Sequence, residues 1–548
     1  MYVSLRRFWS LYTHENSHFA AYSFVNNCFC STFIIQSPEP KLSLSMLNKH
    51  LRICLIALAL SVFVPFLLSC SPARATQKPK DGYNIKIKMK GAKDTVYLGY
   101  HYGSQIYIED TFRLDPKTGV CEMKGEKTLF GGIYLAITMD KNAKGKKETK
   151  YFDFLVDNKE QHFSLEVDTS DFVKSMKITN SPTNDLFNKY QRYLATHQDD
   201  LNKWKTELDT LNAHKNKTPE DTVRARDLRE KLTAKDKEIN EYRLDFVKKN
   251  PTSLLTTIFK GMQEVQAPDD VKKVDSLWLR YIRQHYWDNI DFNDERLVRT
   301  PVLGGKITAF LENYTVRTPD SIIVSANQII DKSLNNKETF KFTLTQVMTM
   351  YENPKYMGMD AVFVNLAERY YLNADSKVYW MDSVRMKKLR ERVEKMKLTL
   401  IGVQATPMVM QDTAMQTHKL YDVKAEYTVI LFWSHSCGHC KKHMPEYIDI
   451  YNKYKSKNVD FYSVCTDPDQ KEIKKFIVEQ KVNFPVYFDA YGRNNIHHNY
   501  DIYSTPVVYV LDKDKKIKAK RLSSEQLDDI LGKFLNKESA GMIKESRN

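Results

Sequence analysis

The run Cys437-Gly-His-Cys440 constrains this 548-residue chain more than any other feature. It follows the apolar stretch Tyr427–Trp433, which is typical of a buried strand, and precedes a helical pattern that we expect Pro445 to break. The strand-to-helix junction would place Cys437 at a helix N-terminus, where unpaired backbone N–H groups and the macrodipole favour a thiolate. Cys440 would lie one turn further on, so the pair predicts a dithiol/disulfide couple. Half of a zinc site is the alternative, although such a site usually needs a second ligand pair.

The sequence after this motif continues to alternate between strand and helix patterns. Val459–Cys465 predicts a second buried strand, and Gln470–Gln480 predicts a helix. Pro506 leads directly into an apolar run, which is an unusual start for a central strand. A last strand is predicted at Lys516–Lys520, and a closing helix is predicted from Ser524. The inner face of that helix would carry Leu527, Ile530, Leu531 and Phe534.

This order of elements resembles the thioredoxin fold, and the segment from Phe432 to Pro445 is similar to the membrane-anchored, extracytoplasmic branch of that family. The branch contains cytochrome-maturation reductases and redoxin-domain lipoproteins, and the resemblance covers the last quarter of the chain. It implies a thiol:disulfide oxidoreductase whose only redox group is the Cys437–Cys440 disulfide, with no other cofactor and no metal. It also implies that Thr505-Pro506 is cis and faces the disulfide.

The roles implied by the resemblance follow the motif residue by residue. Cys437 would be the attacking thiolate and would form a mixed disulfide with an exposed substrate cysteine, and Cys440 would resolve it, leaving an intramolecular disulfide. Thr505 and Pro506 would shape the groove for an extended substrate segment, because proline removes a backbone donor. Trp433 would pack beneath the loop.

Two positions depart from the family pattern. Leu431 stands where thioredoxins carry a buried aspartate that relays protons to the second cysteine, and Ser436 replaces the usual tryptophan before the first cysteine. Proton transfer would then fall to His439, His435 or water.

The dipeptide between the cysteines is expected to tune the redox potential. Gly438-His439 matches the pairing found in protein disulfide isomerases. A cationic imidazole beside Cys437 would stabilise the thiolate and hence the reduced form. This moves the expected potential from about −270 mV toward about −180 mV, which is about 4 kcal/mol for two electrons. We therefore expect a more oxidising couple than thioredoxin.

The N-terminal region predicts export and membrane attachment. Lys49 and Arg52 precede an apolar run from Cys54 to Leu68, which is typical of a signal sequence at 46–70. Its ending, Leu-Leu-Ser-Cys70, resembles a lipobox in which Cys70 becomes lipid-modified. An uncleaved transmembrane anchor is the alternative, although the run is short for a bilayer span. Residues 1–45 are expected to be an unstructured upstream extension, with Met46 as an alternative start.

This targeting signal predicts the compartment and the partners. The body would lie in the cell envelope, on the periplasmic side of a membrane or as an outer-membrane lipoprotein. Its partners would be protein thiols or disulfides, the membrane through its lipid anchor and, if it works as a reductase, a membrane electron relay. The net charge of +15 comes from lysines interleaved with acids, and export argues against a nucleic-acid partner. The sequence leaves the oligomeric state open.

Few cysteines remain for a structural role once Cys70 is acylated. Of the eight cysteines, only Cys121, Cys437, Cys440 and Cys465 would then remain free in the mature chain, which is too few for a disulfide scaffold. Cys121 and Cys465 lie in apolar strand-like runs and are expected to be buried, inert thiols.

The whole chain is predicted to be a multidomain α+β protein. After a linker at 71–81, short alternating strands predict a β-sandwich at 82–180, similar to the small β domain of Bacteroidetes redoxin lipoproteins. Apolar heptads and a proline-containing cap at Thr218 predict a helical hairpin at 181–253. The central all-α region continues at 254–397 and resembles a helical domain of unknown function in the same lipoproteins. A thioredoxin-like α/β domain at 398–540 and a tail at 541–548 complete the chain.

Other functions stay open as alternatives. A thiol peroxidase of the redoxin superfamily would carry a Pro-x-x-x-Thr-x-x-Cys context, but here Trp433, Ser434 and Ser436 stand upstream of Cys437 and no proline does. A metal carrier could use His435, His439 or His443 around the cysteines, with a distant ligand from His497 or His498. In a scaffold lipoprotein, the dithiol would serve only as a tether.

Overall fold

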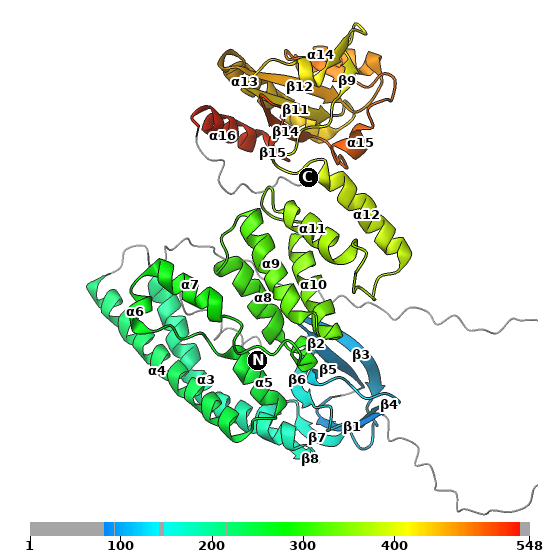
Figure 1. Ribbon diagram of the computed structural model, residues 1–548. Coiled ribbons are helices and arrows are strands. Elements are labelled where there is room, and N and C mark those ends of the chain that lie inside the picture. Colours follow the sequence, from blue (N-terminus) through cyan, green and yellow to red (C-terminus); the bar gives the residue numbers. More distant parts are fainter. Residues whose placement is uncertain (1–81, 93, 142–146, 215–217, 538–548) are drawn as a thin grey trace, which may run out of the picture. The chain divides into compact units, whose positions relative to one another are not determined.

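The computed structural model describes residues 82–92, 94–141, 147–214 and 218–537 (Figure 1). The predicted extension, signal sequence, Cys70, linker 71–81 and tail 541–548 lie outside the described residues. Backbone contacts divide the chain into two compact units. The first reaches residue 262 and includes 299–301, and the second contains 263–298 and everything from 302. The predicted fold class, with an N-terminal β-sandwich, a central all-α region and a C-terminal thioredoxin-like domain, is confirmed.

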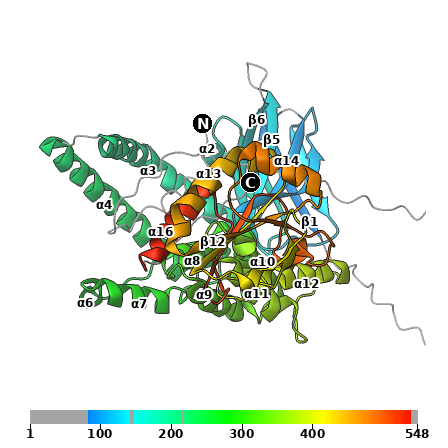
Figure 2. The ribbon, with the colours of Figure 1, turned by 90° about the horizontal axis from the view of Figure 1, so that it is seen from above.

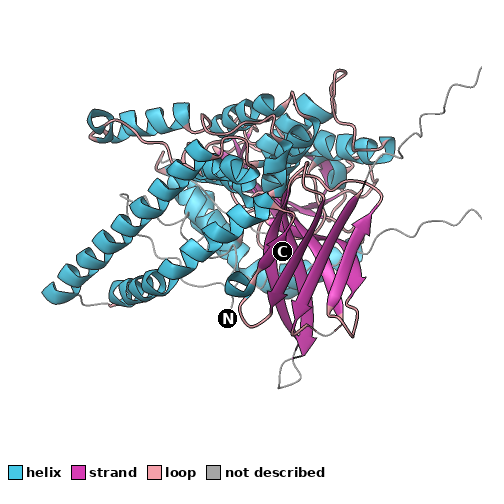
Figure 3. Cartoon of the chain, turned by 90° about the horizontal axis from the view of Figure 1, so that it is seen from below, coloured by secondary structure: helices cyan, strands magenta, loops and turns pink. Residues whose placement is uncertain are grey.

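The first unit begins with two four-stranded sheets that face each other across one core (Figure 3). One sheet has the order β4-β1-β7-β8, and the other has the order β3-β2-β5-β6. Strand β1 pairs antiparallel with β4 and parallel with β7. The strands are β1 (Tyr83–Lys90), β2 (Thr95–Tyr102), β3 (Gln105–Arg113), β4 (Val120–Gly125), β5 (Gly132–Lys141), β6 (Lys147–Val156), β7 (His162–Asp168) and β8 (Lys177–Thr179), with the one-turn helix α2 (Phe172–Ser175) before β8.

Alternation of apolar and charged residues explains why these segments form a sandwich. In β1, Ile85 and Ile87 are buried in the core, whereas Lys86 and Lys88 point to solvent. Successive strand side chains point to opposite faces, so β1 buries one face only. In β5, by contrast, the consecutive residues Ile133–Thr138 are all buried. Cys121 also lies in this core, and burial raises the pKa of its thiol to about 12.

A pair of long helices follows the sandwich (Figure 1). Helix α3 (Pro182–Ala213) and α4 (Pro219–Lys249) pack against each other, and α5 (Leu254–Met262) contacts both. Thr218 caps α4 in a reciprocal capping box with Asp221, as the proline-containing start signal predicted. Tyr190 and Tyr242 stack across the helix pair, with ring centroids 5.9 Å apart.

The second unit starts with short and medium-length helices. Buried apolar side chains such as Ile329, Leu344 and Val362 hold α9, α10 and α11 together. No helix in the described ranges is both long enough and apolar enough to span a bilayer. The helices are α6 (Asp269–Lys272), α7 (Asp275–His285), α8 (Pro301–Asn313), α9 (Pro319–Ser333), α10 (Lys337–Glu352), α11 (Asp360–Leu366) and α12 (Ser383–Lys397), with a 3₁₀ turn at Glu295–Arg299 and a π-helical turn at Ala367–Tyr371.

The same unit ends in a seven-stranded sheet with the order β10-β9-β13-β12-β11-β14-β15. Strand β11 pairs parallel with β12 and antiparallel with β14, so it lies in the middle of the sheet. The elements are β9 (Val409–Gln411), β10 (Thr417–Lys419), β11 (Tyr427–Trp433), α13 (Gly438–Tyr454), β12 (Val459–Cys465), α14 (Gln470–Gln480), β13 (Val486–Phe488), α15 (Ile496–Asn499), β14 (Val507–Asp512), β15 (Ile517–Lys520) and α16 (Ser524–Leu535).

Both faces of this sheet are covered. Leu431 and Trp433 pack with residues of α13, α14 and α16 on one face, whereas Ile430 and Phe432 pack with α15 and the segment before β11 on the other. Figure 2 shows α13 and α16 side by side over the sheet. Burial on both faces explains why β11 reads as a continuous apolar run.

The structure corrects one detail of the predicted helix. Pro445 does not break the pattern, because α13 runs through it from Gly438 to Tyr454. Pro445 is exposed, so the carbonyl that loses its helical N–H partner, that of Lys441, lies on the solvent side and can be hydrated.

Candidate redox site

Cys437 lies where the central strand β11 ends and α13 begins. It is the N-cap residue of α13, and its sulfur accepts a hydrogen bond from the Cys440 backbone N–H at 3.4 Å. In its thiol form, it also donates to the Thr505 carbonyl oxygen at 3.2 Å. Both cysteines of the motif are free thiols. The structure thus places the first sulfur at a helix N-terminus, as predicted.

Several groups around Cys437 set its acidity. Partial burial opposes ionisation, but hydrogen bonds outweigh it and lower the pKa of the Cys437 thiol below its usual range. These bonds involve the Thr505 side chain and the backbone N–H groups of Cys440 and His439. His439 therefore contributes through its backbone N–H, whereas the sequence suggested a contribution from its imidazole charge. A thiolate is the nucleophilic form of cysteine, so Cys437 is suited to attack.

Cys440 lies in the opposite environment. Its side chain is fully buried in the core that also contains Trp433, Met444 and Tyr447. Burial raises the pKa of the Cys440 thiol to about 12. Cys440 is therefore protonated at neutral pH, and a partner molecule cannot contact it directly. One accessible, acidified thiol beside one buried thiol is an arrangement that supports attack by Cys437 and resolution by Cys440.

Thr505 and Pro506 face the motif from the start of β14. Their peptide bond is cis, as the resemblance implied. Thr505 contacts the Cys437 sulfur through its carbonyl oxygen, and Pro506 is partly exposed. The loop therefore lies beside the reactive sulfur and remains accessible to a partner.

Trp433 supports the site from below. Its ring is fully buried and stacks on Phe476, with centroids 4.5 Å apart. Its indole N–H donates to the Ser463 hydroxyl on β12 at 2.7 Å. The tryptophan thus links the last residue of β11 to the neighbouring strand and to α14.

Two further positions carry no polar side chain: Gly438 between the cysteines, and Leu431 in the strand before them. A side chain on Gly438 would meet open space, because nothing lies within 4 Å of its Cβ position. Leu431, at the position of the thioredoxin aspartate, is fully buried in the apolar core. No carboxylate therefore replaces that aspartate at the same point of the strand.

Sequence reasoning missed one polar cluster next to the motif. The Ser434 hydroxyl donates to Asp467 at 2.5 Å and also contacts the Ser436 hydroxyl at 2.8 Å. His435 Nε2 lies 3.4 Å from the same Asp467 oxygen. Asp467 follows β12, 33 residues after Ser434, so only the pairing of β11 with β12 brings them together. Asp467 and His435 are titratable groups close to the dithiol loop.

Three of the histidines considered as metal ligands have other partners. His443 contacts Glu446 at 3.0 Å, and His497 contacts the Ile502 carbonyl oxygen at 3.2 Å. His435 pairs with Asp467. Within the described ranges, no three His, Cys, Asp or Glu side chains converge as a metal-binding group.

Comparison with protein families divides the chain into three matched segments. Residues 401–520 match the AhpC/TSA family. Residues 251–397 match a domain of unknown function, DUF5106, and residues 83–187 match another, DUF4369. These matches agree with the predicted small β domain and the predicted helical domain of unknown function.

Individual relatives resemble the C-terminal domain. Thiol-disulfide oxidoreductase ResA of Bacillus thuringiensis subsp. konkukian is 31% identical over 137 residues, which cover 25% of this chain and 78% of that protein. ResA of Bacillus subtilis is 24% identical over 135 residues, covering 25% of this chain and 74% of that protein. A solved domain of a possible thiol-disulfide isomerase from Cytophaga hutchinsonii shares 37% identity with a TM-score of 0.24, covering 25% of this chain and 95% of that chain.

Proposed function

Because this chain belongs to the thioredoxin-like thiol-disulfide oxidoreductases, we propose that it exchanges disulfides with protein substrates through Cys437 and Cys440, outside the cytoplasm and tethered to a membrane. Its oxidoreductase activity follows from the family. The protein substrate, the membrane attachment and the role of each cysteine are the proposed parts.

The observation that carries the proposed roles is the contrast between the two sulfurs. Cys437 is partly exposed and has a lowered pKa, whereas Cys440 is buried and has a pKa raised to about 12. The Cys437 thiolate is the only one of the two that a protein partner can reach. Cys440 is one helical turn away, close enough for its backbone N–H to contact the Cys437 sulfur.

The proposed reaction balances with no further redox group. The Cys437 thiolate attacks one sulfur of a substrate disulfide, that S–S bond breaks, and the other substrate sulfur leaves as a thiolate that takes up a proton. Cys440 then loses its proton and attacks Cys437 in the mixed disulfide. The second substrate sulfur leaves, so two electrons pass to the substrate and a Cys437–Cys440 disulfide remains. The reverse sequence oxidises a substrate dithiol.

Trapping tests this proposal directly. Cys440→Ala should accumulate substrate proteins in a disulfide with Cys437 when the full chain is expressed in its native envelope. The double variant Cys437→Ala/Cys440→Ala is the control and should capture none. Equal capture by both variants would contradict the assignment of Cys437 as the attacking thiol.

Location is a separate part of the proposal. The lipobox-like ending at Cys70 supports lipid attachment of the mature chain outside the cytoplasm. A labelled fatty acid should be incorporated into the parent and not into Cys70→Ala, which should also leave the membrane fraction. Labelling of Cys70→Ala at the parental level would argue against a lipoprotein.

Thiol peroxidase activity is the second candidate, and the AhpC/TSA family match is the observation that favours it. Ser434, at the position of the peroxidase threonine, directs its hydroxyl to Asp467. Hydrogen peroxide consumption with a thiol donor, compared between the parent and Cys437→Ser, distinguishes the two candidates. We expect no consumption that depends on Cys437.

A further inference from the structure

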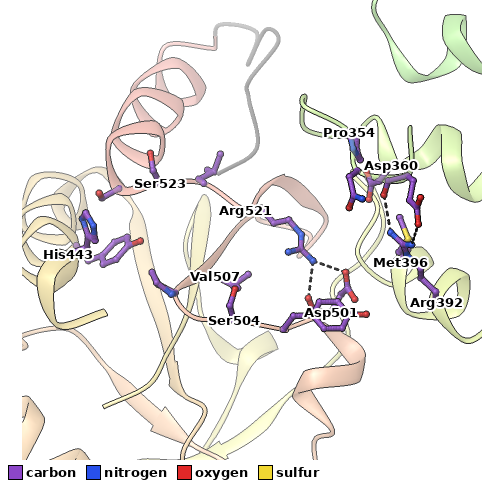
Figure 4. Close-up of a pocket in the computed structure, with 17 residues that line it drawn as sticks. Pro354, Asp360, Arg392, Met396, His443, Asp501, Ser504, Val507, Arg521 and Ser523 are labelled. Carbon is purple, nitrogen blue, oxygen red and sulfur yellow. Dashed lines mark hydrogen bonds and ion pairs between the residues drawn. The ribbon is translucent and has the colours of Figure 1, made fainter. Parts of the chain in front are cut away.

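A cavity of about 290 Å³ lies next to the cis-proline loop (Figure 4). Ser504, Pro506 and Arg521 belong to the wall contributed by the thioredoxin-like domain. The opposite wall comes from the helical segment and includes Glu352, Asp360 and Arg392. Ser504 and Pro506 flank Thr505, whose carbonyl oxygen is 3.2 Å from the Cys437 sulfur. The cavity therefore begins one residue away from the group that contacts the reactive sulfur.

Buried contacts fix the helical wall to the sheet. Lys520, the last residue of β15, forms an ion pair with Asp360, and both side chains are almost fully buried. The same Lys520 ammonium donates to the Thr399 carbonyl oxygen at 2.8 Å, and its backbone N–H contacts the Met357 sulfur at 3.2 Å. These contacts hold the end of the helical segment against β15, so both walls belong to one compact unit.

The cavity offers buried hydrogen-bond acceptors that have no donor. Asp360 is 6% exposed and Asp501 is 8% exposed, and both line the cavity. One carboxylate oxygen of each has no hydrogen-bond partner among the described residues. The donors nearby are engaged elsewhere: Arg521 pairs with the other oxygen of Asp501, and Arg392 pairs with Glu352. The Tyr503 hydroxyl, which also lines the cavity, interacts with the Asp501 carboxylate as well, but one oxygen of Asp501 stays unpaired. A buried acceptor left unpaired is unfavourable, so a ligand that donates hydrogen bonds would be favoured here.

The size and position of the cavity suit part of a polypeptide. Sites for whole small molecules occupy roughly 300–1,000 Å³, so this cavity is at the lower limit for such a ligand. A substrate bonded to Cys437 would run past Thr505, and adjacent residues of an extended chain are about 3.3 Å apart. A side chain next to the substrate cysteine is therefore within reach of the cavity.

We propose that this cavity is a specificity subsite that takes an N–H-bearing side chain (an amide, ammonium or guanidinium group) from the residue beside the substrate cysteine, and that the helical domain builds half of it. This inference rests on the proposed function. It assigns the helical segment, a domain of unknown function, a direct role in choosing the substrate.

A peptide panel tests the subsite in the unmodified protein. The reduced full chain is mixed with disulfide-linked peptide dimers that differ only beside the cysteine, carrying lysine, glutamine, methionine or glutamate. Each rate is divided by the rate with the matching alanine peptide dimer, which offers the cavity no N–H-bearing side chain. Oxidised glutathione is measured alongside as a general disulfide substrate. We expect lysine and glutamine peptides to react at least fivefold faster than methionine and glutamate peptides. Equal normalised rates for all four peptides would overturn the subsite.

A bulky residue on the helical wall tests the role of that domain. Asn353 is exposed and lines the cavity, so Asn353→Trp should narrow it and reduce the preference for lysine and glutamine at least fivefold. Asn335→Trp, at another exposed turn of the helical segment that does not line the cavity, is the matched control and should keep the parental preference. A parental preference in Asn353→Trp would overturn the part played by the helical domain. Failure of the parent to react with any disulfide, glutathione included, would instead contradict the proposed function.

Discussion

The sulfur of Cys437 lies 3.2 Å from the carbonyl oxygen of Thr505, although 68 positions separate these residues in the chain. The contact joins the end of β11 to the start of β14, two neighbouring strands of the central sheet. The reactive sulfur is thus held between a helix N-terminus and the cis-proline loop.

The two motif cysteines should react with an alkylating agent at very different rates. Cys437 is accessible and has a lowered pKa, whereas burial raises the pKa of Cys440 to about 12. Of the two motif cysteines, iodoacetamide should therefore label only Cys437, with a midpoint below the ordinary cysteine pKa of about 8.5. Mass spectrometry across a pH series measures this, with Cys440→Ala as the control. A midpoint of 8.5 or higher would contradict the prediction.

The backbone N–H of His439 should matter for the acidity of Cys437. This N–H helps to lower the pKa of the Cys437 thiol, and it is lost when residue 439 is proline. His439→Pro should raise that pKa, and proline is tolerated in the first turn of a helix. His439→Ala keeps the N–H and is the comparison that isolates the imidazole. If His439→Ala and His439→Pro raise the alkylation midpoint equally, the His439 imidazole lowers the pKa of Cys437 and the backbone N–H does not.

The buried Cys440 thiol should make stability depend on pH. Its pKa is about 12 in the folded protein and about 8.5 in the unfolded chain. The folded state therefore holds the proton more tightly, and this contribution is complete below about pH 8.5 and is lost as the pH rises toward 12. The free energy of unfolding of Cys437→Ala should fall above pH 8.5 relative to that of Cys437→Ala/Cys440→Ala. Urea unfolding at pH 7 to 10.5 measures the difference, and a constant difference would refute the assignment.

The Trp433–Ser463 hydrogen bond should contribute to the stability of the domain. Ser463→Ala leaves the buried indole N–H without its acceptor, which should cost about 1–3 kcal/mol. Trp433→Phe should also lower the free energy of unfolding. The double variant should lose less than the sum of the two single losses, because either substitution alone already removes the hydrogen bond. Urea unfolding of the four proteins completes the cycle. Strictly additive losses would show that the bond is energetically unimportant.

Removing only one partner of the Lys520–Asp360 ion pair should lower the free energy of unfolding strongly. Asp360→Asn leaves the ammonium of Lys520 buried without its counter-ion, which should cost about 3–5 kcal/mol. Lys453→Met, which breaks a largely exposed ion pair with Asp528, is the matched control and should cost less than about 1 kcal/mol. Chemical unfolding monitored by tryptophan fluorescence compares them. Equal losses of unfolding free energy in Asp360→Asn and Lys453→Met would mean that water solvates the Lys520 ammonium as it does an exposed one.

Local patterns in the sequence predicted most of the C-terminal domain. Tyr427–Trp433, Val459–Cys465 and Gln470–Gln480 form the elements expected of them, and the Thr505–Pro506 bond is cis. Each signal depends on residues close together in the chain, namely an apolar run, a helical period or a single proline. The strands β9, β10 and β13 are only three residues long, which is too short to show a period.

Long-range contacts explain what the sequence did not reveal. Asp467 reaches Ser434 only because β11 and β12 pair, and Asp360 reaches Lys520 across 160 positions. Neither aspartate has a neighbour in sequence that indicates its partner. The cavity beside Pro506 depends on such a contact, since one wall comes from a different domain.

The unequal burial of the two sulfurs also limits how partners can bind. In the proposed reaction, every intermolecular disulfide must be formed at Cys437, whether the chain is giving or receiving electrons. One partner protein restores the starting redox state of the Cys437–Cys440 pair, and another is the substrate. Both would then bind the same surface, one after the other. An excess of either one should therefore inhibit turnover by competing with the other.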